Sequence, residues 1–115
     1  MLSIPRLVLA ITAVLVLSLA ALTTSAGARG SAKIKVGDDF FSPDSKTIAA
    51  GKKVKFNWIG SDEHNVVQAK GPGADFDSGH LQGSGVLFTH KFKKAGTYKI
   101  ICTIHDDMKL RLKVQ

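Results

Sequence analysis

The chain has 115 residues, a formal net charge of +7 at pH 7 and a sequence pI near 9.8. With a single cysteine it cannot form an internal disulfide bridge, and its length leaves room for one small domain with a modest core. The sequence contains no repeat, low-complexity tract or boundary that would indicate a second domain.

The first 28 residues are typical of a targeting segment. "MLSIPR" carries one positive charge, Arg6, and residues 7–22 form an apolar stretch without any charge. Small residues follow in "TTSAGA", where a signal peptidase would cleave after Ala26 or Ala28. The stretch also approaches the roughly 20 residues that span a bilayer. We therefore expect residues 1–28 to be a signal peptide or an N-terminal membrane anchor, and residues 29–115 to be an exported domain, periplasmic or extracellular.

The basic composition has two interpretations. Because an exported chain seldom meets nucleic acid, we expect no nucleic-acid partner, and an acidic protein or an anionic surface fits the charge better. In the simpler interpretation, lysines fill the outward positions of sheet faces, where they keep the surface soluble and protect strand edges from pairing.

From residue 29 onward the predicted elements are strands. Apolar and polar residues alternate in "AKIKV", "KKVKFNW", "TYKIIC" and "LRLKV", as expected for strands with one face in a core and the other in water. Turn signals such as "SPDS", "KGPGAD" and "KKAGT" separate these runs. Short strands at close spacing, with no helical segment between them, indicate an antiparallel sandwich or barrel. In chain order, we expect strands near residues 32–36, 46–49, 53–58, 64–69, 86–93, 96–102 and 109–114.

The only cysteine stands in "CTIHDDM", just before the last predicted strand. Cys102, His105 and Met108 follow one another at even spacing, and alternation in the preceding strand turns Cys102 inward. Taken singly, they would be a small core residue, a surface loop residue and a core filler. Together they offer a thiolate, an imidazole and a thioether, which suit a soft metal. A metal would also protect a free thiol that is prone to oxidation in an exported protein.

Such a site needs one more donor, and three other histidines are available: His64, His80 and His90. His64 stands in "SDEHNVV", where a turn leads into a predicted strand, so its side chain can project toward a neighbouring loop. Two histidines, one cysteine and a weak methionine are diagnostic of electron-transfer copper. Zinc is the rival metal, but it commonly takes four strong nitrogen, sulfur or oxygen ligands, and methionine is a poor one.

These motifs resemble those of the cupredoxins, the blue copper proteins, of the amicyanin and plastocyanin kind. "HNV", followed later by "GTYKIICTIHDDM", is similar to the family's ligand segments, and the short spacing from His105 to Met108 is similar to that of amicyanin-like members. "DDFFSPDSKTIAAGKKVKFNW" and "GVLFTHKFKKAGTY" resemble other parts of the family pattern, so the likeness covers nearly the whole exported domain. The resemblance implies an antiparallel Greek-key β-sandwich of about seven to eight strands with one type 1 copper ion.

The resemblance also implies a role for each site residue. His64, Cys102 and His105 would be the three strong ligands, and Met108 the weak axial one. Asn65 would tie the His64 segment to the cysteine loop around Thr103, a role that fits the general use of outer hydrogen bonds to orient ligands.

The implied function is the transfer of single electrons between larger redox partners, with His105 as the surface point of entry. A dehydrogenase, a cytochrome, or a copper reductase or oxidase would all fit as partner, and we expect a monomer. The chain departs from the family in the surroundings of the histidines, where many members have a flat apolar docking patch. Here Asp62 and Glu63 precede His64, and Asp106 and Asp107 follow His105. A locally acidic copper end that orients a basic partner is one hypothesis, and ordinary polar loops are the alternative.

Neither remaining histidine is expected to bind the copper. His80, in "DSGHLQGSG", is expected at the surface. In "VLFTHKF", alternation places His90 with Phe88 and Phe92 toward the core, unless a bulge turns it outward.

Other classes of protein fit less well. A multicopper oxidase needs additional histidine pairs and a binuclear copper site needs two cysteines, so we expect no enzyme in a chain with four histidines and one cysteine. A periplasmic copper carrier could use the same donors, but carriers favour exposed, exchangeable clusters. A module without metal, in which Cys102 is merely buried, would leave the joint spacing of the donors unexplained.

Overall fold

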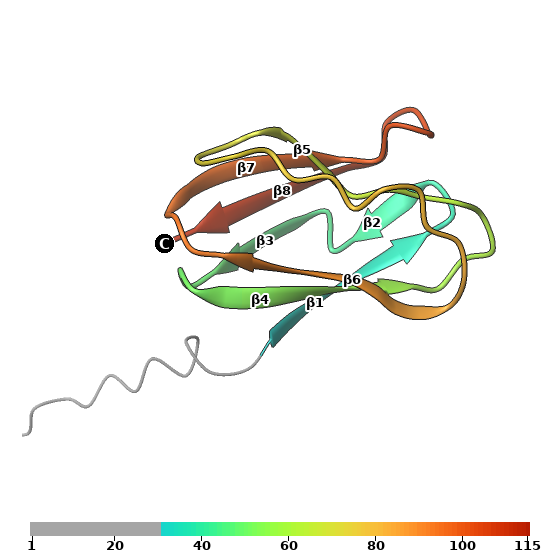
Figure 1. Ribbon diagram of the computed structural model, residues 1–115, viewed down its shortest axis with the longest axis horizontal. Coiled ribbons are helices and arrows are strands. Elements are labelled where there is room, and N and C mark those ends of the chain that lie inside the picture. The colour runs from blue at the N-terminus through green and yellow to red at the C-terminus, as the bar shows by residue number, and fades with distance from the viewer. Residues whose placement is uncertain (1–30) are drawn as a thin grey trace, which may run out of the picture.

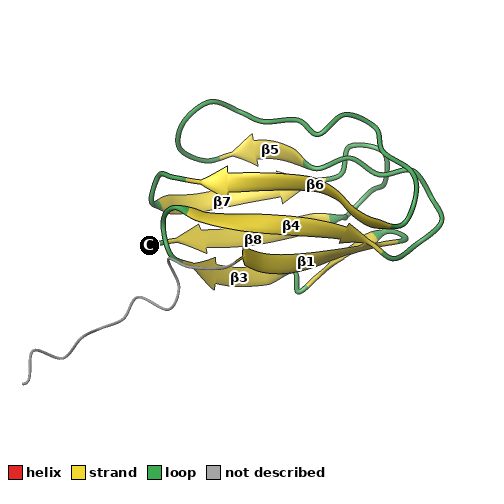
Figure 2. Cartoon of the chain, turned by 60° about the horizontal axis from the view of Figure 1, so that its bottom comes forward, coloured by secondary structure: helices red, strands yellow, loops and turns green. Residues whose placement is uncertain are grey.

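The computed structural model describes residues 31–115, which form two four-stranded sheets packed face to face (Figures 1 and 2). The first sheet has the order β2-β1-β4-β6 and the second β3-β8-β7-β5. The strands are β1 (Ser31–Gly37), β2 (Phe40–Ser42), β3 (Ser45–Ile48), β4 (Lys52–Trp58), β5 (Val67–Lys70), β6 (Gly85–Phe92), β7 (Gly96–Ile101) and β8 (Lys109–Val114). Among these residues there is no helix that could cross a membrane. The targeting segment predicted at residues 1–28 lies outside the described residues.

The predicted all-β sandwich is confirmed, with eight strands, but its sheets are mixed. β1 pairs in parallel with β4, and β3 pairs in parallel with β8, while the other four pairings are antiparallel. The cause lies between β2 and β3, which are separated by two residues yet belong to different sheets. Because the chain crosses to the second sheet and returns before β4, the strands β1 and β4 run in the same direction.

The alternation in the sequence sorts side chains between core and solvent. In β8, Leu110, Leu112 and Val114 are buried while Arg111 and Lys113 are exposed. The same pattern in the neighbouring strands builds one contiguous apolar core between the sheets. Alternate burial therefore explains why short strands of this composition are stable only when the two sheets pack together.

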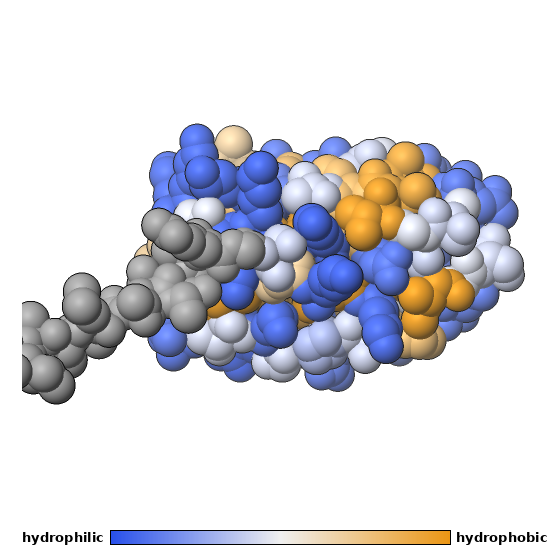
Figure 3. Space-filling view, turned by 90° about the horizontal axis from the view of Figure 1, so that it is seen from below, coloured by the Kyte–Doolittle hydropathy of each residue, from blue (hydrophilic) through white to orange (hydrophobic). Residues whose placement is uncertain are grey.

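The outer face of the first sheet is mainly hydrophilic, but its apolar residues gather toward one end (Figure 3). Lysines face each other across the strands, as in the Lys33–Lys55 and Lys53–Lys91 pairs. Among the described residues, the large apolar side chains that remain exposed are Phe40, Ile59, Val86 and Ile104. The interpretation of lysines as outward, solvated residues thus holds for this face.

Two parts of the chain differ from the predicted strand pattern. β2 has three residues, too few for a recognisable alternation, and the sequence did not predict it. The strand predicted at residues 64–69 begins only at Val67, and His64 makes an isolated bridge with Leu81. His64, Asn65 and Val66 are all buried, so they lack the alternation of a half-exposed strand.

Three connecting segments meet at one end of the sandwich, on the right in Figure 1. They are the turn at residues 38–39, the segment at residues 59–66 and the loop at residues 102–108. Asp38 accepts hydrogen bonds from the backbone N–H groups of Ser61 and Asp62, and Asn65 bonds to Thr103. These contacts hold the three segments together at the end where the predicted donors lie.

His90 lies on the core side of β6, as the alternation predicts. Its ring stacks on Phe76 at a centroid distance of 4.1 Å and lies edge-on to Phe92 at 4.8 Å. Because burial disfavours the charged imidazolium, the pKa of His90 is lowered from its ordinary value. The folded state therefore prefers His90 neutral.

We expect stability to fall on acidification because of His90. A lowered folded-state pKa means that the unfolded chain takes up a proton first, so the stability contribution is complete above the ordinary pKa of about 6.5 and is lost below it. Denaturant unfolding of metal-free protein at about pH 7.5 and about pH 5.5 measures this loss. His90→Phe, which keeps an aromatic ring in the stack, should lose less stability over the same interval. Equal losses in the two proteins would contradict this assignment.

Candidate metal centre

The structure brings His64, Cys102 and His105 together. One ligand atom from each lies within 4.8 Å of the others, and the Nδ1 atom of His64 is 3.9 Å from the Sγ atom of Cys102. Met108 is buried and lines a hollow that Cys102 and His105 also line. The four donors predicted from the sequence thus meet at one end of the sandwich, whereas His80 and His90 lie outside this cluster.

The backbone places each donor by a different means. Cys102 directly follows β7 and continues its alternation, so its side chain points into the core. Met108 stands directly before β8, and its carbonyl oxygen accepts a hydrogen bond of 3.1 Å from the N–H of Cys102. This bond closes the loop between the two strands and holds the sulfur-bearing residues at its base. His64 comes from the segment that connects β4 of the first sheet to β5 of the second, and it is fully buried.

His105 is the accessible member of the group. Its side chain is 23% exposed, and its ring centroid is 4.7 Å from that of His64. Its Nδ1 atom is 3.0 Å from a carboxylate oxygen of Asp39, and its Nε2 atom is 3.0 Å from the carbonyl oxygen of Glu63. Both neighbours are acceptors, so His105 can bind an ion only by exchanging one of these contacts for the metal bond.

Asn65 connects the His64 segment to the cysteine loop. Its Oδ1 atom accepts a hydrogen bond of 2.7 Å from the N–H of Thr103, and its Nδ2 group donates one of 2.7 Å to the Thr103 hydroxyl. Asn65 itself is buried. The amide therefore fixes two segments that are distant in sequence but carry neighbouring donors.

Asp38 is a site residue that the sequence reasoning missed. Its carboxylate lies 3.0 Å from the Nε2 atom of His64 and accepts hydrogen bonds from Ser61 and Asp62. These donors lower the pKa of Asp38 to about 2, the backbone N–H of Asp62 having the largest effect. The only signal in the sequence is the acidic pair in "GDDF", which follows an alternating run and could mark any polar turn.

The donor set fits copper better than zinc. Two imidazoles, one thiol and one thioether include a soft, weak ligand that zinc seldom accepts but that electron-transfer copper sites use. The second group of possible metal donors among the described residues, Asp39, Asp62 and His105, shares His105 with the first and is more exposed. It is therefore a part of the same surface and not a separate centre.

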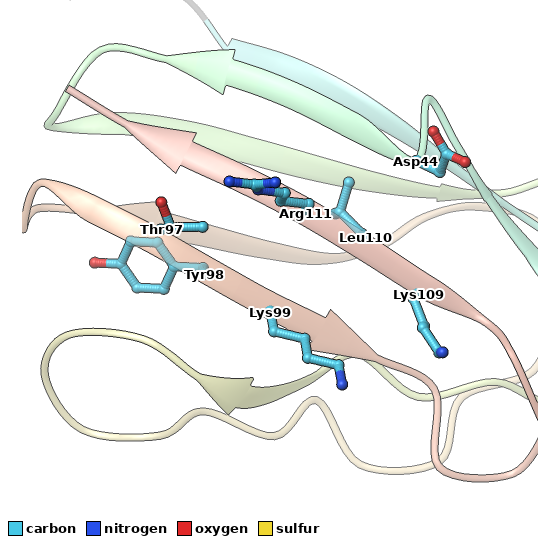
Figure 4. A pocket seen from close by; sticks show the side chains of 7 residues that line it. All are labelled: Asp44, Thr97, Tyr98, Lys99, Lys109, Leu110 and Arg111. Atoms are coloured by element: carbon cyan, nitrogen blue, oxygen red, sulfur yellow. The ribbon is translucent and has the colours of Figure 1, made fainter.

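A hollow of about 370 Å³ on the outer face of the second sheet offers no comparable chemistry (Figure 4). Its cationic side chains are Lys99, Lys109 and Arg111. In Figure 4 the Arg111 side chain extends away from the two lysines, so the three charges do not converge on a common point. The candidate site is consequently the donor cluster at the end of the sandwich.

Comparison with known proteins agrees with this geometry. The sequence matches the family of copper binding proteins described as the plastocyanin/azurin family over residues 28–115. Plastocyanin of Dryopteris crassirhizoma is 31% identical over 96 residues, which cover 70% of this chain and 94% of that protein. Amicyanin-alpha of Methylorubrum extorquens is 33% identical over 87 residues, which cover 75% of this chain and 73% of the relative.

Fold and donor set together define a small β-sandwich metalloprotein of the cupredoxin class. The chain belongs to the plastocyanin/azurin family of copper-binding proteins, whose members are typically electron carriers. The resemblance found in the sequence is thereby confirmed, and copper is the cofactor.

Solved structures give the same architecture. A mutant fern plastocyanin has a TM-score of 0.61 at 35% identity and covers 73% of this chain and 100% of its own. A reduced mutant of amicyanin has a TM-score of 0.67 at 21% identity, covering 76% of this chain and 85% of its own, which supports the fold alone. A copper-containing nitrite reductase from Thermus scotoductus has a TM-score of 0.64 at 24% identity, but the match covers only 22% of that enzyme's chain and 75% of this one.

We expect Asn65→Ala to destabilise the metal-free protein by about 1–3 kcal/mol, because the buried Asn65 amide makes two hydrogen bonds to Thr103 and both are lost. Thr103→Ala is the matched control, since it removes only the hydroxyl contact and keeps the backbone bond to Asn65. The loss of stability in Thr103→Ala should be about half as large as in Asn65→Ala. Urea unfolding measures both, and an Asn65→Ala protein as stable as the parent would contradict the proposed link between the segments.

Proposed function

We propose that this protein is a small exported blue copper protein that transfers single electrons between larger redox partners as its copper alternates between Cu(II) and Cu(I). The observation that carries this proposal is the meeting of His64, Cys102 and His105 within 4.8 Å at one end of the sandwich, where Met108 lines a hollow together with Cys102 and His105. Membership of the copper-binding family supports it.

In this proposal, His64, Cys102 and His105 are the strong ligands and Met108 is the weak one. When bound, the copper would supply the one-electron chemistry, and the thiolate of Cys102 would be its most strongly coupled ligand. The protein contributes a fixed arrangement of donors. The backbone hydrogen bond from Cys102 to Met108 and the two hydrogen bonds between Asn65 and Thr103 resist rearrangement of the loop. Electron transfer is fast when the ligands move little between the two oxidation states.

His105 is the proposed point at which electrons enter and leave. It is the exposed histidine of the pair, since His64 is fully buried. Of the nine acidic residues, six lie in the segments around it: Asp38, Asp39, Asp62, Glu63, Asp106 and Asp107. Phe40, Ile59 and Ile104 stand beside these acids and are exposed. A redox partner with a basic patch around an apolar centre would complement this end.

A copper carrier that uses the same ligands is the second candidate function. A carrier must release its ion readily, which favours exposed and exchangeable donors. Here Cys102, His64 and Met108 are all buried, so copper exchange would require the loop to open. Electron transfer is therefore the better account, and we do not propose an enzymatic activity.

We also propose that residues 29–115 form an exported, monomeric domain. All eight strands and the apolar core lie in residues 31–115, and the match with fern plastocyanin covers 94% of that protein. A domain of this extent is consequently expected to fold alone. Residues 1–28 are proposed to be a signal peptide, with a membrane anchor as the alternative.

The first test is the visible spectrum of residues 29–115 after addition of copper(II). We expect an intense blue or green thiolate-to-copper band that a mild reductant bleaches, because Cys102 is the sulfur ligand. Cys102→Ser and His64→Ala should both lack the band. A colourless protein, or equal copper binding without Cys102, would favour the carrier or a domain without a resident metal.

A second test concerns the acidic end. Asp106→Asn combined with Asp107→Asn should slow electron transfer to a basic cytochrome several-fold at low ionic strength, because the attraction that orients the partner is weakened. The difference should shrink as salt is added. Asp44→Asn combined with Asp75→Asn removes the same charge outside the loops around His105 and should change the rate less. Identical rates for all three proteins would show that the acids are ordinary polar loop residues.

A further inference from the structure

The turn between β1 and β2 touches both histidines of the donor cluster. Its two residues are Asp38 and Asp39, and each has a carboxylate oxygen 3.0 Å from a ring nitrogen, of His64 and of His105 respectively. Asp38 is 26 residues from His64 in the sequence, and Asp39 is much farther from His105, so these contacts exist only in the folded protein.

The two carboxylates are held very differently. Asp38 accepts N–H bonds from Ser61 at 3.1 Å and Asp62 at 3.0 Å, so its orientation is fixed by the backbone of the segment that leads to His64. Gly60 allows this close approach, because a Cβ atom there would overlap the Asp38 carboxylate. Asp39 is 62% exposed and adopts a left-handed conformation with φ of 72°, and its carboxylate pairs with the ring of His105.

The Asp38 contact decides which ring nitrogen of His64 carries the hydrogen. An ionised carboxylate can only accept a hydrogen bond, so the Nε2 atom of His64 must be the donor. In a neutral imidazole the other nitrogen is then unprotonated. That atom, Nδ1, is the one that lies 3.9 Å from the sulfur of Cys102. His64 is fully buried, so water cannot compete for either nitrogen.

We propose that Asp38 is a positioning residue that holds His64 in the Nε2–H tautomer, with Nδ1 directed at the copper position, and that it favours Cu(II) over Cu(I). This inference rests on the proposed copper site. A carboxylate behind a histidine ligand makes the imidazole a stronger donor and orients its ring, and the more highly charged ion gains more from a stronger donor. Asp38 therefore lowers the reduction potential relative to a site without it.

Asp38→Asn is the decisive variant, because it keeps the size and shape of the side chain but lacks the charge. Its single accepting oxygen also replaces two, since Asp38 accepts from Ser61 on Oδ2 and from Asp62 on Oδ1. Its amide can also donate to Nε2, which would place the hydrogen on Nδ1, the wrong tautomer for metal binding. NMR of the nitrogen-labelled, metal-free protein should show a mixed or reversed His64 tautomer. Copper(II) affinity should fall about 10–100-fold. The reduction potential should rise by about 59 mV for each tenfold loss of copper(II) affinity that copper(I) does not share.

Asp39→Asn is the matched control. It makes the same substitution one residue away, beside the other histidine, and Asn tolerates the left-handed conformation well. The His64 tautomer should remain that of the parent protein. Gly60→Ala is a second variant that displaces the Asp38 carboxylate without changing charge, and it should shift the tautomer and the potential in the same direction as Asp38→Asn.

The proposal is overturned if the His64 tautomer is the same in Asp38→Asn and the parent, or if Asp39→Asn shifts it equally. These outcomes differ from failure of the proposed function. A parent protein without a thiolate-to-copper band would remove the electron-transfer role, while the tautomer of the metal-free protein would still decide what Asp38 does to His64.

Discussion

Two hydrogen bonds join Asn65 to Thr103, which is 38 residues away in the sequence. Asn65 lies in the connection between the two sheets, and Thr103 lies in the loop between β7 and β8 of the second sheet. One segment carries His64 and the other carries Cys102, so the distance between nitrogen and sulfur depends on this link. A sandwich fixes its strands by core packing but leaves its loops comparatively free. The link, together with the Asp38 contacts to residues 61 and 62, gives the loops at this end a defined geometry.

The same loop geometry also explains how the single cysteine is accommodated. Cys102 is free and buried, in a domain too small to rely on a large core. Its alternation along β7 points it inward, and the loop that it begins ends at Met108, whose carbonyl receives the Cys102 N–H. The thiol is thereby kept from solvent while remaining beside the two histidines. Protection of the sulfur and formation of the copper site are consequences of one loop conformation.

Positive and negative charges lie on different parts of this small surface. Lysines cover the outer sheet faces, as in the cross-strand Lys33–Lys55 pair, whereas most carboxylates surround His105. Asp38 and Asp39 had no evident role in the sequence, yet each lies against a histidine. The same acidic residues thus have two separable effects: contact with the ligands from within the turn, and a field that acts on an approaching partner.

The sequence by itself determined most of the strands and the types of donor. The alternation in "LRLKV" can be recognised from the sequence without knowledge of any tertiary contact, because neighbouring side chains of a strand face opposite sides. The spacing in "CTIHDDM" and the family resemblance likewise identified His64, Cys102, His105, Met108 and Asn65 as the residues to examine. Only the tertiary structure decided the parallel pairing of β1 with β4, the isolated bridge of His64 with Leu81 and the contact of Asp38 with the Nε2 atom of His64. These features depend on how loops distant in sequence pack against each other, and local periodicity carries no information about such packing.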